Sequence, residues 1–194
     1  IRRVVGISGR VEFVNHLRMR FDYARAIPWV RQAGTADAPE LRAIAGPDAL
    51  VLRGVAVAPD DHAHSGRLAV AAGETRDLSL TWHPSHHAPP EQLDVDAVLA
   101  QTTQWWQSWA DRIEHGGVYH DDVVRSLLLL RALSHQDTGG IVAAATTSLP
   151  EHFGGVRNWD YRFVWLRDAA LTLQALIEHG FIGVAHHWRT WLLR

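Results

Sequence analysis

The chain has 194 residues, of which 47% are hydrophobic and 21% are charged, a composition that is ordinary for a globular protein of one or two domains. Its formal net charge of -2 gives no reason to expect nucleic acid or an anionic membrane surface as a partner. No apolar run approaches the ~20 residues of a membrane-spanning helix, and without cysteine the chain has no disulfide or thiolate chemistry.

We expect the chain to be a piece of a longer protein, because it begins at Ile1 without methionine and stops at Arg194 inside a helical pattern. The start has no signal-peptide pattern. Together with the missing cysteines, this predicts a cytoplasmic location.

Residues 1–83 predict an antiparallel β-sandwich without a helix longer than two turns. Apolar and polar residues alternate over residues 11–21, which predicts one long half-buried strand. Shorter apolar runs follow, separated by turn residues such as Gly46-Pro47-Asp48 and Gly73-Glu74. These runs cover residues 41–45, 50–58, 67–72 and 78–82.

One loop of this region contains Asp60, Asp61, His62 and His64. A metal site there would need further convergent ligands, so we expect a solvated polar loop. Elsewhere the sequence has no metal-ligand cluster, phosphate-binding glycine loop or nucleophilic triad, and we expect no metal and no cofactor.

Residues 84–117 predict a linker that contains a helix. The stretch HPSHHAPPEQ (residues 83–92) has three prolines, which disfavour regular structure, and the composition changes from β to α after it. Asp94 can cap the helix that follows. Its apolar stripe at helical spacing is Val95, Val98, Leu99, Thr102, Trp106, Trp109 and Ile113. Trp105, Trp106 and Trp109 could form a platform for a sugar, but packing of the helix is the favoured interpretation.

Residues 118–194 predict further helices around a long connection. One helix begins at Asp121-Asp122, another runs from about Asp168, and a fourth apolar stripe follows Gly180. In the helix from Asp168 we expect Leu173, Leu176 and Ile177 inward, and Gln174 and Glu178 outward. The connection over residues 141–167 is long, and loops of that length are usually functional or disordered. Its aromatic content argues against disorder.

Residues 154–173, GGVRNWDYRFVWLRDAALTL, place rings at alternate positions with charged and amide side chains between them. The rings are Trp159, Tyr161, Phe163 and Trp165. A sugar suits such a surface, because its C–H face stacks on indole or phenol and its hydroxyls need oriented donors and acceptors. Asp168 also sits where a helix N-cap belongs, and Trp159 and Trp165 could be core residues. Spacing alone therefore slightly favours a structural role.

The segments TGGIVAAATTSLPE (residues 138–151) and GGVRNWDYRFVWLRDA (residues 154–169) resemble glycoside hydrolase family 15, the glucoamylase and trehalase family in its bacterial and archaeal form. The resemblance implies a multidomain β + α protein: an antiparallel β-sandwich, a linker helix, and the first helices of an (α/α)6 barrel over residues 118–194. It also implies inverting hydrolysis of α-glucosides. In the family an Arg-Asp pair and preceding aromatic residues bind the sugar at the non-reducing end, which maps onto Arg167, Asp168, Trp165 and Tyr161.

Arg157, Asn158, Trp159 and Asp160 are weaker candidates, for shaping the loop or supporting the residues that touch the sugar. Asp160 and Asp168 look like an acid and base pair, but in the family both catalytic residues are glutamates from later parts of the barrel. We therefore expect neither the acid nor the base in this chain, and no glucosidase activity of the chain alone. A sugar-binding protein without catalysis and a helical scaffold whose aromatic loop is an interface remain alternatives, and an oligomer is compatible with each.

Overall fold

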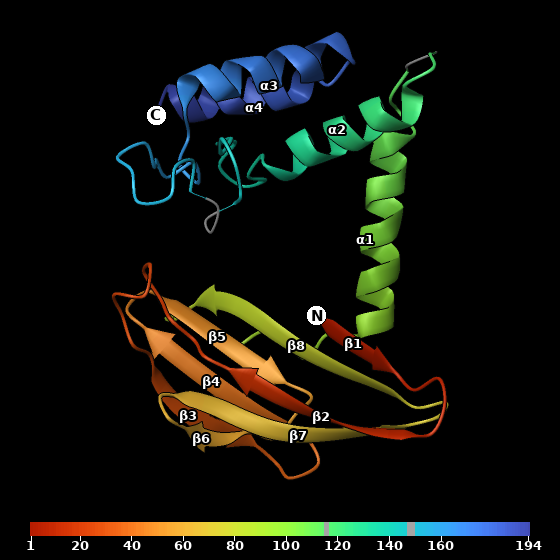
Figure 1. The fold of residues 1–194 in the computed structure, drawn as a ribbon, viewed down its shortest axis with the longest axis vertical. Helices are drawn as coiled ribbons and strands as arrows, with labels where there is room; N and C mark the ends of the chain where they lie inside the picture. The colour runs from red at the N-terminus through yellow and green to blue at the C-terminus, as the bar shows by residue number, and fades with distance from the viewer. Residues whose placement is uncertain (115–116, 147–149) are drawn as a thin grey trace. The chain divides into compact units, whose positions relative to one another are not determined.

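The fold is given by a computed structural model that describes residues 1–114, 117–146 and 150–194 (Figure 1). The chain forms two compact units, Ile1–Leu99 and Ala100–Arg194. Residues 115–116, and residues 147–149 of the family-like motif, lie outside the described residues.

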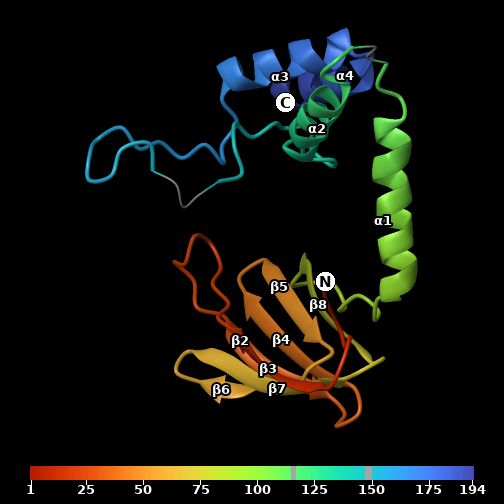
Figure 2. The same cartoon turned by 45° about the vertical axis from the view of Figure 1, so that its right-hand side comes forward.

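Eight strands build the first unit. They are β1 (Arg2–Val5), β2 (Arg10–Leu17), β3 (Trp29–Gly34), β4 (Pro39–Ala45), β5 (Asp48–Arg53), β6 (Ala58–Asp60), β7 (Ala63–Ala71) and β8 (Thr75–Pro84). A five-stranded sheet has the order β1-β8-β5-β4-β3, a three-stranded sheet has the order β2-β7-β6, and each pair is antiparallel. Figure 2 shows the two sheets facing each other. Residues 1–84, all described, contain no helix, so the predicted antiparallel β architecture is confirmed.

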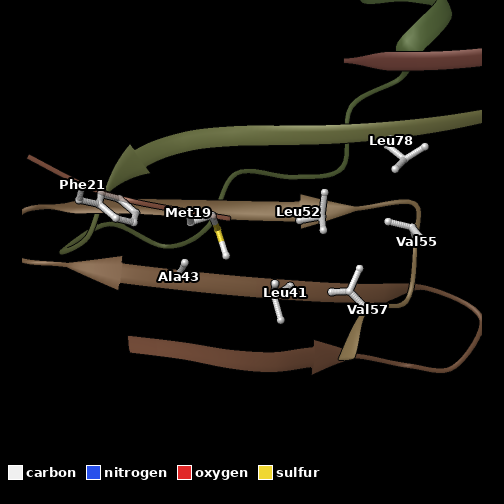
Figure 3. Packing of buried hydrophobic residues seen from close by; sticks show 8 residues of the cluster. All are labelled: Met19, Phe21, Leu41, Ala43, Leu52, Val55, Val57 and Leu78. Atoms are coloured by element: carbon white, nitrogen blue, oxygen red, sulfur yellow. The ribbon is translucent and has the colours of Figure 1, made fainter. Parts of the chain in front are cut away.

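The core of this unit lies between the two sheets. Figure 3 shows eight of its buried side chains: Met19, Phe21, Leu41, Ala43, Leu52, Val55, Val57 and Leu78. Leu17 of β2 and Leu68 of β7 pack against this cluster from the three-stranded sheet. Burial of these apolar surfaces is the main force that holds the sheets together.

The long strand predicted over residues 11–21 is wrong in its second half. β2 ends at Leu17, yet Met19 and Phe21 are buried from the segment that follows. Phe21 forms an isolated antiparallel bridge with Ala26, and the residues 22–24 between them have positive φ angles. The alternation continued past Leu17 because the chain leaves the sheet while still inserting every second side chain into the core.

Two further strand boundaries differ from expectation. The predicted strand over residues 50–58 breaks after Arg53, because Gly54 has a φ of +94° and a Cβ there would lie 2.0 Å from the carbonyl oxygen of Asp77. Only glycine fits so close to another backbone. Pro84 was expected to disfavour regular structure, but β8 includes it as the last residue, where a missing ladder donor is tolerated.

The helices are α1 (Val95–Ala110), α2 (His120–Ala132), α3 (Leu166–Glu178) and α4 (Ile182–Leu192). The predicted cap of α1 is confirmed, since the N–H of Ala97 donates to Oδ1 of Asp94 at 3.0 Å. The outward pair of α3 is confirmed too, because Nε2 of Gln174 donates to Oε1 of Glu178 at 2.9 Å.

One hydrophobic cluster of the second unit joins α1, α2 and α3 to the residue that precedes α4. It is the cluster Trp109, Ile113, Leu127, Leu176 and Phe181. Trp109 is therefore a core residue, as the packing interpretation predicted, and not part of an open platform. The expectation for Ile177 is wrong: its side chain is 44% exposed. The buried stripe of α3 is Ala169, Thr172, Leu173 and Leu176, and Ile177 lies at its edge in the last turn.

Candidate sugar-binding site

Backbone hydrogen bonds from an earlier part of the long connection (residues 141–167) hold the aromatic loop at its base. The N–H of Ala143 donates to the carbonyl of Phe163 at 3.1 Å, and the N–H of Ala144 donates to the carbonyl of Tyr161 at 2.8 Å. Ile141, just ahead of these residues, is buried against Ala169 and Leu173 of α3. The connection is therefore tied to α3 at a defined place.

Trp165, not Asp168, is the N-cap residue of α3. Its backbone is extended, with φ -108° and ψ 123°, and its side chain makes no capping bond. Asp168 is the third residue of the helix, so the predicted cap position is wrong by three residues. An N-cap without a side-chain bond leaves no signature in the sequence. In the first turn the carboxylate still faces the positive end of the helix dipole.

The four main candidates lie together at this helix start. Nη2 of Arg167 donates to Oδ2 of Asp168 at 3.0 Å, and the guanidinium carbon of Arg167 lies 5.9 Å from the Trp165 ring centroid. The ring of Tyr161 stacks on that of Trp165, with 5.6 Å between centroids and 25° between planes. The Arg167 side chain is 68% exposed and that of Asp168 28%, so the charged pair reaches solvent. Two rings and an ion pair thus share one surface.

Asn158 shapes the loop ahead of these residues. Its Nδ2 donates to the carbonyls of His152 at 2.8 Å and Gly155 at 3.0 Å, and its Oδ1 accepts the N–H of His152 at 3.0 Å. Gly154, inside the closed turn, has a φ of +70°, which favours glycine. All three of these hydrogen bonds go to the backbone, which gives the Asn158 amide a structural role.

Asp160 is bound by a neighbouring cation. Its carboxylate accepts from Nε of Arg162 at 2.8 Å, from Nη2 at 2.5 Å and from the N–H of Arg162 at 3.0 Å. These hydrogen bonds lower the pKa of Asp160 to about 2, and those from the Arg162 side chain have a larger effect than the one from its backbone N–H. A general acid must hold a proton near the working pH, so Asp160 does not suit that role.

Glu151 is a residue of this loop to which the sequence reasoning gave no role. The hydroxyl of Tyr161 donates to its Oε2 at 3.4 Å, and Nη2 of Arg157 lies 3.4 Å from its Oε1. Its place at the end of the family-like motif was the available signal. Arg157 therefore has a carboxylate partner. The side chain of Trp159 is 48% exposed.

No group of three or more His, Cys, Asp or Glu within the described ranges could hold a metal ion. Asp60, Asp61, His62 and His64 line a cavity of about 310 Å³ in the first unit, where Oδ2 of Asp60 accepts from the hydroxyl of Ser65 at 2.6 Å.

Among the helices of the described residues, none is both long and apolar enough to cross a membrane.

Residues 117–194 match the family model of glycosyl hydrolases family 15, and this part of the chain belongs to that family. Its relatives include proteins named trehalase. One from Mycobacterium tuberculosis is 32% identical over 191 residues, which covers 93% of this chain and 27% of the relative. One from Thermoplasma volcanium is 49% identical over 83 residues, which covers 43% of this chain and 13% of the relative.

A trehalase from Mycolicibacterium smegmatis is 30% identical over 188 residues, again 93% of this chain and 28% of the relative. The chain thus spans about a quarter of the length of the two mycobacterial relatives, and its match covers 13% of the archaeal one. No solved structure matches the chain closely enough to be counted as similar.

Proposed function

We propose that this chain is part of an inverting, trehalase-like glycoside hydrolase that releases glucose from an α-glucoside. In this proposal Arg167, Asp168, Trp165 and Tyr161 form part of the first glucose-binding subsite. The observation that carries it is their juxtaposition at the start of α3, where stacked rings lie beside a solvent-reaching ion pair. The relatives named trehalase favour trehalose over starch-type glucans as the substrate.

The chemistry of the four residues fits one pyranose ring. The carboxylate of Asp168 can accept hydrogen bonds from two adjacent hydroxyls, and Arg167 can donate to a third. Trp165 and Tyr161 provide an apolar wall for the C–H face of the sugar. The existing bond between Arg167 and Asp168 orients both groups before the sugar arrives, which lowers the entropic cost of binding.

The two catalytic carboxyl groups lie outside this chain in our proposal. Inverting hydrolysis needs an acid and a base roughly 6.5–9.5 Å apart, with room for a water molecule between the base and the sugar. Asp160 is held by Arg162, and Asp168 is assigned to sugar binding. We place both catalytic groups, as glutamates, in later helices of an (α/α)6 barrel that begins with α2, α3 and α4.

The 194-residue chain alone should consequently not hydrolyse α-glucosides. The missing acid and base are each worth roughly 10²–10⁴-fold in rate. The chain should also associate in solution, because Leu129, Leu166 and Leu171 of the helices are more than 60% exposed. Turnover of any α-glucoside by the purified chain would contradict this placement of the catalytic groups.

The decisive experiment gives trehalose, maltose, isomaltose and soluble starch to the full-length protein. Hydrolysis of trehalose with release of β-glucose, followed by NMR of the anomeric proton, is the expected result. Release of α-glucose alone from trehalose, without initial β-glucose, would contradict inversion. Binding of trehalose without hydrolysis of any of the four would support the alternative, a carbohydrate-binding protein on the same scaffold.

A further inference from the structure

The indole of Trp165 is held by the backbone of a residue five positions earlier. Its Nε1 donates to the carbonyl oxygen of Asp160 at 3.2 Å. This bond fixes the rotation of the ring about the side chain, since an indole has only one donor. Tyr161 stacks on the same ring at 5.6 Å, so the direction of both aromatic faces depends on where the carbonyl of Asp160 lies.

The side chain of Asp160 fixes that carbonyl. Its Oδ1 accepts the N–H of Arg162 at 3.0 Å and the Nε of Arg162 at 2.8 Å, and its Oδ2 accepts Nη2 at 2.5 Å. The backbone bond closes a local turn, and the two guanidinium bonds add the planar geometry of a fork. Three bonds within three residues therefore leave the peptide after Asp160 little freedom.

We propose that the Asp160–Arg162 pair is a positioning clamp that orients the Trp165 ring for the first sugar of the substrate. The inference rests on the proposed function, because it assumes that Trp165 carries the sugar. Neither member of the pair has to touch the substrate. The clamp works through the carbonyl of Asp160, which accepts the indole N–H, while the carboxylate is occupied by Arg162.

The clamp stays closed at neutral pH. The pKa of Asp160 is lowered to about 2 by the bonds from Arg162, so the carboxylate remains ionised well below neutral pH. The arrangement thus behaves as a fixed part of the site and not as a switch.

The test uses Asp160→Asn in the full-length protein. Asparagine keeps an acceptor for the N–H of Arg162 but loses the charge that holds the guanidinium. We expect KM for the cleaved α-glucoside to rise about three- to tenfold with a smaller change in kcat, because a stacking wall binds ground state and transition state alike. Arg162→Lys, which keeps the charge but not the fork, should give a weaker change in the same direction.

The matched control is Asp77→Asn. Asp77 accepts the same kind of fork, from Nε and Nη2 of Arg3 at 2.7 Å each, but it lies on β8 and has no part in the aromatic loop. Its KM and kcat should equal those of the unchanged protein. An equal rise of KM in both variants would reduce the effect of Asp160 to general stability and overturn the proposal.

A second measurement does not depend on activity. With 5-fluorotryptophan incorporated, the ¹⁹F resonance of Trp165, assigned by Trp165→Phe, should shift and broaden in Asp160→Asn and stay in place in Asp77→Asn. An unmoved resonance overturns the clamp. A protein that neither binds nor cleaves any α-glucoside would refute the proposed function, and this resonance would still decide whether Asp160 orients the ring.

Discussion

The indole of Trp109 stacks on the phenyl ring of Phe181, with 4.1 Å between the ring centroids and 14° between their planes. Both side chains are almost fully buried, at 4% and 6% exposure. The guanidinium carbon of Arg112 lies 5.0 Å from the Phe181 centroid, so a cation covers the same ring. This contact binds the last turn of α1 to the residue that precedes α4.

Truncating the Trp109 side chain should therefore remove much of the stability of the helical unit. Trp109→Ala should lower the free energy of unfolding by about 3–5 kcal/mol, the usual cost of removing a buried large aromatic side chain. Trp105→Ala is the control, because Trp105 is 45% exposed and should cost about 1 kcal/mol or less. Urea unfolding of both variants measures the difference, and equal losses would contradict the assigned core.

Asp168→Asn separates sugar binding from a structural role. Removing the charge should cost about 1.5–3 kcal/mol for each charge-assisted bond to the sugar. This corresponds to at least a tenfold to hundredfold fall in kcat/KM of the full-length protein at about 1.4 kcal/mol per tenfold. Because Asp168 is the third helical residue, its helix-dipole contribution is only about 0.3–1 kcal/mol, and the melting temperature should change little.

Asp122→Asn is the matched control for this change, since Asp122 is the third residue of α2. It should alter the melting temperature as little as Asp168→Asn does and leave kcat/KM unchanged. If Asp168→Asn kept kcat/KM within about threefold, which is under ~0.7 kcal/mol, Asp168 would be a helix-start residue only.

Asn158→Ala should open the turn over residues 152–158. Three bonds to the backbone disappear with the amide, so the N–H groups of this turn should exchange with deuterium faster than in the unchanged protein. Asn158→Asp keeps the acceptor for the His152 N–H but not the two donors, and its effect should be intermediate. Exchange in α2 serves as the internal reference, and unchanged rates in the turn would show that other contacts hold it.

Glu40 should make the stability of the first unit depend on pH. Burial alone raises the pKa of Glu40, but hydrogen bonds from Arg42 and from Arg53 at 2.8 Å outweigh it, and the net pKa is lowered. A carboxyl group with a lowered folded pKa stabilises the fold above its unfolded pKa of about 4.3. That stability is lost as the pH falls through the folded value.

Glu40→Gln should accordingly cost about 1–3 kcal/mol at pH 7, and the difference from the unchanged protein should shrink below about pH 4. Thermal melts between pH 7 and pH 3 provide the measurement. Glu12→Gln is the control, because its 3.5 Å pair with Arg67 is more than half exposed on both sides and contributes little. A difference that stays constant with pH would exclude the ion pairs as its cause.

The strands could be predicted largely because period-two alternation and turn residues act over short distances. Gly46 and Pro47 close the β4–β5 hairpin as a two-residue loop, with a φ of +59° at Gly46. The same alternation overextended the first long strand, since Met19 reaches the core without pairing in a sheet. A pattern of burial does not distinguish a strand from an extended segment that leaves it.

For the candidate site, the sequence could name residues but not the contacts between them. The resemblance named Arg167 and Trp165, and the structure places them within one small surface. The resemblance could not supply the contacts of the candidate residues. The hydrogen bond between Glu151 and Tyr161, for example, depends on how a long connection folds back on itself. Likewise, nothing local in the sequence marks Trp165 as the first residue of α3.

Arg53 determines where the chain can be divided for expression. Its Nη2 donates to the carbonyl of Pro90 at 2.8 Å and its Nη1 to that of Glu91 at 3.3 Å, while Nη1 of Arg3 donates to Asp96 at 2.6 Å. The proline-rich stretch is thus fastened to the sheet, and the first turn of α1 is held by β1. A truncation within residues 85–93 would strip bonds from the β unit, whereas one placed after Leu99 would leave each of them intact.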